Sequence, residues 1–144
     1  MLVRNILDAK GSRVITTQPD ATIAATSRLL STNRIGAVLV TDRSGGIVGV
    51  LSERDIVNGL ARHGGAVTEQ TVAELMTRNV HTCAPGDTIA EVMAVMTERR
   101  IRHLPVLDNG RLAGMISIGD VVKYRLDEAK LEVDSLREYV LAAH

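Results

Sequence analysis

The chain has 144 residues, enough for one compact domain or for two small halves that share a core. Hydrophobic residues make up 45% of it and charged residues 24%, as in ordinary globular proteins. Its 17 basic and 17 acidic residues cancel, which excludes a long-range field that would attract nucleic acid or a membrane surface, although local charged patches remain compatible with this balance.

An internal repeat organises the chain. The segment Val14–Ala24 aligns with Val80–Ala90, so that Pro19 falls on Pro85. Three further pairs of segments align in the same order: Arg34–Ile35 with Arg100–Ile101, Gly49–Val57 with Gly114–Val122, and the upstream Val3–Leu7 with Val72–Met76. Agreement in residue type and order over this length indicates that one structural unit is used twice.

Each repeat predicts the order strand, helix, strand, strand, helix, preceded by a short lead-in helix. The first repeat predicts a strand over Val14–Thr17, a helix over Thr22–Asn33, strands over Ala37–Thr41 and Ile47–Leu51, and a helix after Ser52. The second predicts a strand over Val80–Cys83, a helix over Thr88–Arg99, strands over His103–Leu107 and Leu112–Ile116, and a helix after Ser117. The N-caps of the two middle helices are Asp20 and Asp87, or alternatively Thr22 and Thr88.

The repeats define the expected domain organisation. The Gly-rich stretch His63–Ala66 links them, which predicts repeat 1 with its lead-in over residues 1–66, repeat 2 over 67–126 and a helical extension over 127–144. Because neither half can bury both faces of a three-stranded sheet, we expect the repeats to pack sheet against sheet about a pseudo-twofold axis, with two clefts between them. The fold class is α/β (α+β), with a long C-terminal helix.

The C-terminal segment predicts one long helix that continues the last helix of repeat 2. No Gly or Pro occurs from Asp120 to Ala143. Apolar residues recur there at alternating spacings of four and three, as Val122, Leu126, Ala129, Val133, Leu136, Val140 and Ala143. Such a heptad stripe must pack on something, either its own subunit or a second chain. We expect a homodimer stabilised in part by this helix, or a higher oligomer.

Compartment and metal chemistry are constrained by what the sequence lacks. No apolar run approaches the ~20 residues of a membrane-spanning helix, and the N-terminal residues do not form a secretion signal. Cys83 is the only cysteine, which rules out an intrachain disulfide and fits a reducing cytoplasm. Cysteine and histidine lack the close spacing of metal ligands, so no metal site is expected.

One short motif occurs in both repeats at the same place. It is a Gly, two apolar residues, a Ser, two variable residues and an Asp, and it reads Gly49–Asp55 and Gly114–Asp120. Ser as the N-cap and Asp three residues later meet at a helix N-terminus, where backbone N–H groups favour an ionised carboxylate. That carboxylate can serve a plain capping box, or it can accept hydrogen bonds from the two hydroxyls of a ribose. Spacing alone favours the capping box.

This repeated unit resembles the cystathionine-β-synthase-type (CBS) domain, over nearly the whole chain up to about Leu126. The resemblance implies that Asp55 and Asp120 bind ribose, with Ser52 and Ser117 near the ribose or phosphate. It also implies that Val50 and Met115 line an adenine pocket. The lead-in segments Lys10-Gly11-Ser12 and Thr77-Arg78-Asn79 would each serve the cleft whose Asp comes from the other repeat.

The resemblance also implies that the two clefts are unequal. Arg102 and His103 hold a position that often faces phosphate in this family, whereas repeat 1 has Gly36 and Ala37 there. Arg54 can substitute for these charges in the Asp55 cleft. Since the chain has no Trp or Phe and only two Tyr, aliphatic side chains and backbone must hold the base, not an aromatic stack.

The expected function is a non-enzymatic regulatory module for adenosine-containing ligands. AMP is the first candidate, with ADP, ATP, NAD(H) and S-adenosylmethionine as others. Ligand binding would shift the population of two arrangements of the repeats and so bias a partner surface. The alternative is a structural dimerisation module without a ligand, although the presence of both Asp55 and Asp120 argues against it. No catalytic constellation points to an enzyme.

Overall fold

In a computed structural model that describes residues 1–143, the chain forms two compact units. Unit 1 contains residues 1–13 and the chain from Thr82 onward, whereas unit 2 is the continuous segment Val14–His81. Each unit thus combines one repeat with the lead-in segment of the other. This differs from the expected division at residues 66 and 126, because the lead-in helices pack away from the repeats that they precede.

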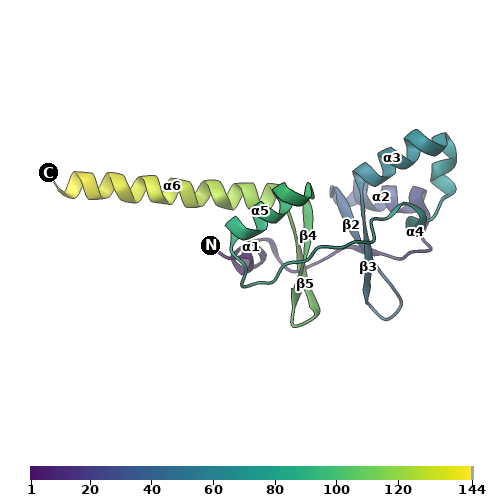
Figure 1. Cartoon of the computed structure of the whole chain (residues 1–144), viewed down its shortest axis with the longest axis horizontal. Coiled ribbons are helices and arrows are strands. Elements are labelled where there is room, and N and C mark those ends of the chain that lie inside the picture. The colour runs from purple at the N-terminus through teal and green to yellow at the C-terminus, as the bar shows by residue number, and fades with distance from the viewer. Residues whose placement is uncertain (144) are drawn as a thin grey trace. The chain divides into compact units, whose positions relative to one another are not determined.

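Unit 2 is built on a three-stranded sheet in the order β1-β2-β3, of which β2 and β3 are labelled in Figure 1. Strand β1 (Thr16–Thr17) runs parallel to β2 (Ala37–Thr41), and β2 pairs antiparallel with β3 (Ile47–Ser52). The remaining elements are α2 (Ile23–Asn33), α3 (Glu53–His63), the 3-10 helix η1 (Gly64–Glu69) and α4 (Val72–Leu75). The helices and the hairpin fall within a residue or two of their predicted bounds, because capping residues, apolar spacing and the turn mark them locally.

The core of unit 2 contains residues from the sheet, from the helices and from the lead-in segment of repeat 2. It comprises Ile23, Leu30, Val38, Val40, Leu51, Val67, Val72 and Met76. The Gly-rich stretch that was expected to be a simple link continues into η1, where Val67 is buried in this core. Gly59 of α3 permits this close packing, since a Cβ there would lie 2.5 Å from Leu75 and 3.0 Å from Val67.

Unit 1 contains a two-stranded antiparallel hairpin with helices around it. Strand β4 (His103–Asp108) pairs with β5 (Arg111–Ser117), and the helices are α1 (Val3–Lys10), α5 (Ile89–Arg99) and α6 (Ile118–Ala142). The core of this unit consists of residues from every one of these elements: Val3, Ile6, Cys83, Ile89, Val92, Met96, Leu104, Val106, Ile116 and Val121. The lead-in helix α1 thereby completes the core of the second repeat.

The expected strand over Val80–Cys83 is wrong, because only Cys83 forms a bridge, to Val106. The Cys83 amide donates to the Pro105 carbonyl at 3.0 Å, and the Leu107 amide donates to Cys83 at 2.9 Å. Extending this parallel ladder toward Val80 would require an N–H on Pro105, which proline lacks. Repeat 1 has Leu39 at the corresponding place, paired with Thr16, and there a two-residue strand forms.

The middle helices are capped by threonine. Thr22 accepts a hydrogen bond from the Ala25 amide and Thr88 from the Glu91 amide, each at 3.1 Å. Asp87 instead accepts from the Ala84 amide at 2.9 Å and so stabilises the preceding turn. The alternative choice of N-cap is therefore correct, and the aspartate choice is wrong.

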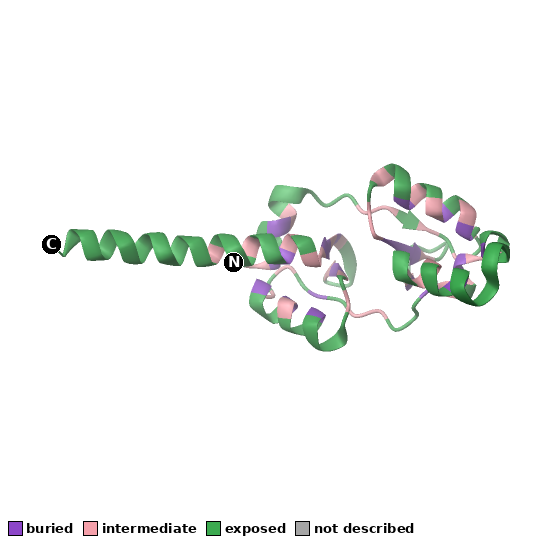
Figure 2. Cartoon of the chain, turned by 90° about the horizontal axis from the view of Figure 1, so that it is seen from above, coloured by how far each residue is buried: buried purple, intermediate pink, exposed green. Residues whose placement is uncertain are grey.

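The long C-terminal helix is confirmed as α6. Figure 2 shows that its last turns are exposed throughout, and the described residues from Ala129 onward are all exposed. Val121 is fully buried at the start of the helix, whereas Leu126 and Leu136 of the heptad stripe are both 65% exposed. The stripe therefore does not fold back on its own unit. None of the helices in residues 1–143 is long and apolar enough to cross a membrane.

Candidate functional site

Each motif segment lies where a strand ends and a helix begins. In unit 2 the Ser52 hydroxyl accepts from the Asp55 amide at 3.2 Å, and Asp55 Oδ2 accepts from the Ser52 amide at 2.9 Å. Ser117 and Asp120 repeat this arrangement in unit 1 with the same two distances, 3.2 Å and 2.9 Å. Both motifs thus form a capping box, which holds a carboxylate at the N-terminus of α3 and of α6.

The neighbouring strand places the predicted phosphate-facing residues at the same ends. His103 pairs with Ser117 across the hairpin, as Ala37 pairs with Ser52 in unit 2. The Arg102 carbonyl accepts from the Ile118 amide at 2.8 Å. His103 is half-buried and Arg102 is exposed, so a basic pair borders the beginning of α6.

Unit 2 offers less positive charge at the corresponding position. Gly36 occupies the position in unit 2 that Arg102 occupies in unit 1, and its carbonyl accepts from the Glu53 amide at 2.9 Å. Unlike Arg102, it has no charged side chain. Arg54 is an exposed residue in the first turn of α3. The two helix ends thus carry different basic residues, Arg54 at α3 and Arg102 with His103 at α6.

The motif glycines allow the lead-in segments to approach the sheets. A Cβ on Gly49 would lie 2.7 Å from the sulfur of Met76 and 3.0 Å from the Thr77 carbonyl. A Cβ on Gly114 would lie 2.6 Å from Leu7. A Cβ at either position would force a neighbour to shift: at Gly49 the neighbours include the backbone carbonyl of Thr77, whereas at Gly114 the nearest atom is the end of the Leu7 side chain. Glycine thus gives the lead-in segments space, and neither position has an unusual backbone angle.

In unit 2 the lead-in segment reaches the motif carboxylate through Thr77. Its hydroxyl lies 3.2 Å from Asp55 Oδ1 and 3.5 Å from Oδ2. Its backbone forms a two-way bridge with Val50, with both hydrogen bonds at 2.9 Å. Arg78 turns away and donates to the Ala73 carbonyl at 3.3 Å, while Asn79 is exposed. Of the three predicted residues of this segment, only Thr77 contacts the acid.

In unit 1 the lead-in segment reaches the motif carboxylate through Lys10. The Lys10 ammonium lies 2.7 Å from Asp120 Oδ2 and 3.0 Å from the Met115 carbonyl. Gly11 ends α1 with a φ of 96°, and Ser12 is exposed beyond it. The pairing of each lead-in segment with the acid of the other repeat thus occurs inside both compact units.

The surroundings of Asp120 favour its ionised form. Partial burial raises the pKa of Asp120, but the hydrogen bond from Lys10, the Ser117 amide and the Lys10 charge lower it, and the net shift is downward. Its side chain is 25% exposed, so water screens part of this effect. Asp120 is therefore a carboxylate at neutral pH and can act only as a hydrogen-bond acceptor.

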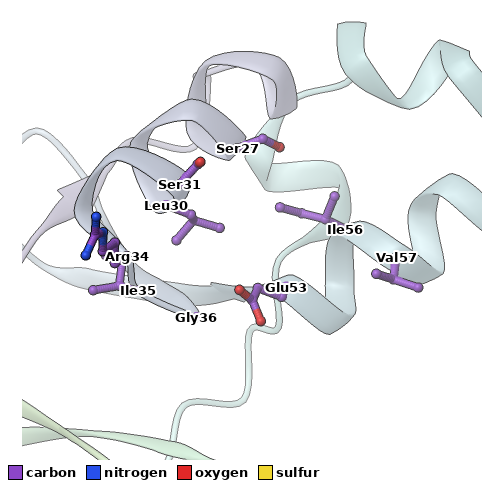
Figure 3. A pocket seen from close by; sticks show the side chains of 9 residues that line it. All are labelled: Ser27, Leu30, Ser31, Arg34, Ile35, Gly36, Glu53, Ile56 and Val57. Atoms are coloured by element: carbon purple, nitrogen blue, oxygen red, sulfur yellow. The ribbon is translucent and has the colours of Figure 1, made fainter.

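Val50 and Met115, the predicted base-lining residues, are both half-buried on the strands that lead into the motifs. In unit 2 a hollow of about 650 Å³ lies between α2 and α3 (Figure 3). Its lining residues are Ser27, Leu30, Ser31, Arg34, Ile35, Gly36, Glu53, Ile56 and Val57. The hollow shares Gly36 with the predicted site, but neither Asp55 nor Ser52 lines it, so we assign it no ligand.

Sequence reasoning missed Leu7 and Met76, the side chains that occupy the space beside the motif glycines. Their signal was the alignment of Val3–Leu7 with Val72–Met76, which predicted a shared lead-in but not its contact. Within residues 1–143, no group of three or more His, Cys, Asp or Glu side chains is placed to hold a metal ion.

Comparison with known proteins identifies the repeated unit. The family model for the CBS domain matches residues 4–62 and 72–127. The crystal structure of the CBS-domain-containing protein ATU1752 from Agrobacterium tumefaciens is 47% identical, covers 86% of this chain and 92% of that chain, and has a TM-score of 0.84. The CBS domain pair of protein MJ0100, solved with 5′-methylthioadenosine and S-adenosyl-L-methionine, is 28% identical, with coverage of 90% and 98% and a TM-score of 0.77.

Curated relatives give the same result. The mitochondrial CBS-domain-containing protein CBSX3 of Arabidopsis thaliana is 30% identical over 125 residues, which are 84% of this chain and 61% of that protein. The chain spans 29% and 61% of the lengths of two curated relatives that it matches, so it is shorter than either. The family matches include both copies of the Gly–Asp motif and both lead-in segments from Arg4 and Val72 onward. The chain therefore belongs to the CBS-domain family and carries two CBS domains in tandem.

Proposed function

We propose that this protein is a cytoplasmic, non-catalytic regulatory module that binds adenosine-containing ligands at the ends of α3 and α6. The observation that carries the proposal is the duplicate placement of Asp55 and Asp120. Each is an acceptor at a helix N-terminus, bonded to its own serine amide at 2.9 Å and contacted by a lead-in segment. The relative MJ0100, solved with two adenosine compounds, supports this ligand class.

The chemistry of the two ends fits a ribose. A carboxylate has about four lone-pair positions. The serine amide uses one of them, the Ser52 and Thr77 hydroxyls use others at Asp55, and the Lys10 ammonium uses another at Asp120. The 2′ and 3′ hydroxyls of a ribose could donate to the others, as charge-assisted hydrogen bonds. The half-buried side chains of Val50 and Met115 provide apolar surface for a base, which suits a chain without Trp or Phe.

Charge favours a phosphorylated ligand, with AMP as the first candidate. Arg102 and His103 border the α6 end, whereas Arg54 is the corresponding basic residue at the α3 end. ADP, ATP, NAD(H) and S-adenosylmethionine share the adenosine part and remain alternatives. Ligand binding would act by stabilising one arrangement of the two units over another, and a partner protein would respond to that shift.

We also propose that the protein is a homodimer, or a multiple of one, held together in part by α6. The heptad stripe is exposed on the described part of the helix, with Val133 47%, Leu136 65% and Val140 52% exposed. Val at the first core position and Leu at the second are the pattern of a two-stranded coiled coil, and Val133 and Leu136 follow it. A second copy would cover the stripe along its length.

Equilibrium dialysis with labelled AMP separates this proposal from a purely structural dimerisation module. We expect saturable binding by the native chain, competed by unlabelled adenosine compounds but not by ribose 5-phosphate, which lacks the base. Heat-unfolded protein at the same concentration is the control for adsorption. If native protein retains no more AMP than unfolded protein, and dimers still form, the structural alternative is correct.

A further inference from the structure

Lys10 connects two acceptors of unit 1 that belong to different elements. It is the last residue of α1, and its ammonium donates to Asp120 Oδ2 of α6 at 2.7 Å and to the Met115 carbonyl of β5 at 3.0 Å. Its side chain is 43% exposed, so the ammonium can leave this position without crossing the core. The Lys10 ammonium thus bonds to both the Asp120 carboxylate and the backbone of β5 at the proposed ligand site.

Unit 2 has no cation at the corresponding place. There Thr77 donates its hydroxyl to Asp55 at 3.2 Å, and its backbone, not its side chain, bonds to Val50. A hydroxyl carries no net charge and can also accept a hydrogen bond, so it can share Asp55 with an incoming donor. Both acids accept from their own serine amide, and Asp55 also accepts from the Ser52 hydroxyl at 3.1 Å. The lead-in contact is a neutral hydroxyl at Asp55 and a cation at Asp120.

We infer that Lys10 is a built-in competitor for Asp120 that makes the α6 site select adenosine compounds with an anionic group over neutral adenosine. The inference rests on the proposed function, in which Asp120 accepts from the ribose. A ribose that bonds to both carboxylate oxygens must displace at least part of the Lys10 ion pair, because Oδ2 already accepts from the Lys10 ammonium and from the Ser117 amide. Neutral adenosine offers the released ammonium no replacement, whereas a phosphate or a longer anionic group does.

The size of the effect follows from the exposure of the pair. A partly exposed ion pair contributes up to about 1 kcal/mol, because water screens it. Releasing it should therefore weaken the binding of neutral adenosine by up to about fivefold. Arg102 acts differently, since it makes no contact with Asp120: it can add affinity for a phosphate but cannot lower the affinity for adenosine.

Calorimetric titration with adenosine and with AMP tests this in a background where only one site keeps its acid. In Asp55→Ala protein, Lys10→Thr installs the unit 2 residue type and should raise adenosine affinity by up to about fivefold. AMP affinity should stay constant or fall, so the preference for AMP over adenosine narrows. The control Lys130→Thr removes an exposed lysine from α6 and should change neither affinity.

The reciprocal variant adds the cation to the other unit. In Asp120→Ala protein, Thr77→Lys should weaken adenosine binding at the α3 site by a similar factor, because Thr77 is exposed and has room for a longer side chain. Arg102→Ala should lower AMP affinity and leave adenosine unchanged, which separates its effect from that of Lys10.

The outcomes distinguish this inference from the proposed function. If the native chain binds neither ligand, the nucleotide proposal fails and the role of Lys10 fails with it. If both ligands bind but Lys10→Thr leaves the ratio of their affinities unchanged, the role of Lys10 is overturned while the proposed function stands. Equal weakening of both ligands by Lys10→Thr would show a merely structural residue and would also overturn it.

Discussion

The side chain of Leu7 fills the space beside Gly114, so that a Cβ added to this glycine would lie 2.6 Å from Leu7 Cδ2. The contact joins the first helix of the chain to its last strand and fixes α1, and with it Lys10, beside Asp120. Met76 and Gly49 form the same relationship in unit 2. The motif glycine is thus the point where each lead-in segment docks on a sheet.

Gly114→Ala should therefore destabilise unit 1, since the added methyl must displace Leu7 from a packed interface. Overpacking of this kind costs about 1–3 kcal/mol. We expect a lower midpoint in urea unfolding followed by circular dichroism. Gly65→Ala is the matched control, because a Cβ there meets nothing within 4 Å. Equal midpoints for the two variants would contradict the docking role of Gly114.

The ion pair of Asp120 predicts a pH-dependent contribution to stability. The folded pKa of Asp120 lies below the ordinary value of 3.8, so the unfolded chain binds the proton first as the pH falls. The stabilisation is therefore complete above pH 3.8 and is lost as the pH falls through the folded pKa. Asp120→Asn should lower the urea midpoint at pH 7 more than at pH 3.

The control for this experiment is Asp134→Asn, which removes a carboxylate from the exposed part of α6. It should change the urea midpoint little at either pH. A difference between Asp120→Asn and the native chain that is the same at pH 7 and pH 3 would rule out a stabilising, low-pKa carboxylate at this position.

Cys83 should be unreactive in the folded chain. The residue is 8% exposed in the core of unit 1, and burial, with a smaller effect of the Asp87 charge, raises the pKa of Cys83 from 9.0 to about 12. Thiolate is the reactive species, so a disulfide reagent at pH 8 should label the protein only as it unfolds. Stability should also fall between pH 9 and pH 12, where the unfolded thiol ionises first.

Labelling kinetics in native buffer and in denaturant measure this directly. The denatured chain is the control, since it exposes the same single thiol. Native labelling as fast as that of the denatured chain would show that Cys83 is accessible and that unit 1 does not pack as described.

If the chain dimerises through α6, substitutions in the heptad stripe should weaken the dimer, whereas substitutions on the opposite face of the helix should not. Leu136→Asp places a charge in the heptad stripe and should weaken the dimer in sedimentation at tens of micromolar. Leu131→Asp is the control, because Leu131 is 59% exposed on the opposite face. A chain ending at Leu126 should keep its fold by circular dichroism and associate more weakly.

A native chain that sediments as a monomer at these concentrations would refute this role for α6. Equal sedimentation of the two aspartate variants would refute the choice of face.

The predictable parts of the fold are those that local sequence specifies. The N-cap residues Ser52 and Ser117 and the helical spacing of apolar residues predict α3 and α6. The Asn-Gly turn predicts the second hairpin. The duplicated acids follow from the repeat alone. These features depend on residues a few positions apart, which a single sequence displays.

The remaining parts depend on contacts between distant residues. The loss of the Val80–Cys83 strand depends on Pro105, which lies outside the segment and cannot donate the next ladder hydrogen bond. The exchange of lead-in segments depends on how Leu7 packs against Gly114. Periodicity cannot show such partners: the pairing of each lead-in segment with the acid of the other repeat was predicted from the family resemblance, whereas the expected domain boundaries followed the order of the chain.

The most direct test of the central claim is a calorimetric titration with AMP of the native chain, Asp55→Ala, Asp120→Ala and the double variant. We expect two ligands per native chain and one per single variant, since each substitution removes a charge-assisted acceptor at a cost of about 2–3 kcal/mol. The double variant should show no binding. If it binds AMP as tightly as the native chain, Asp55 and Asp120 are capping residues only, and the proposed sites are wrong.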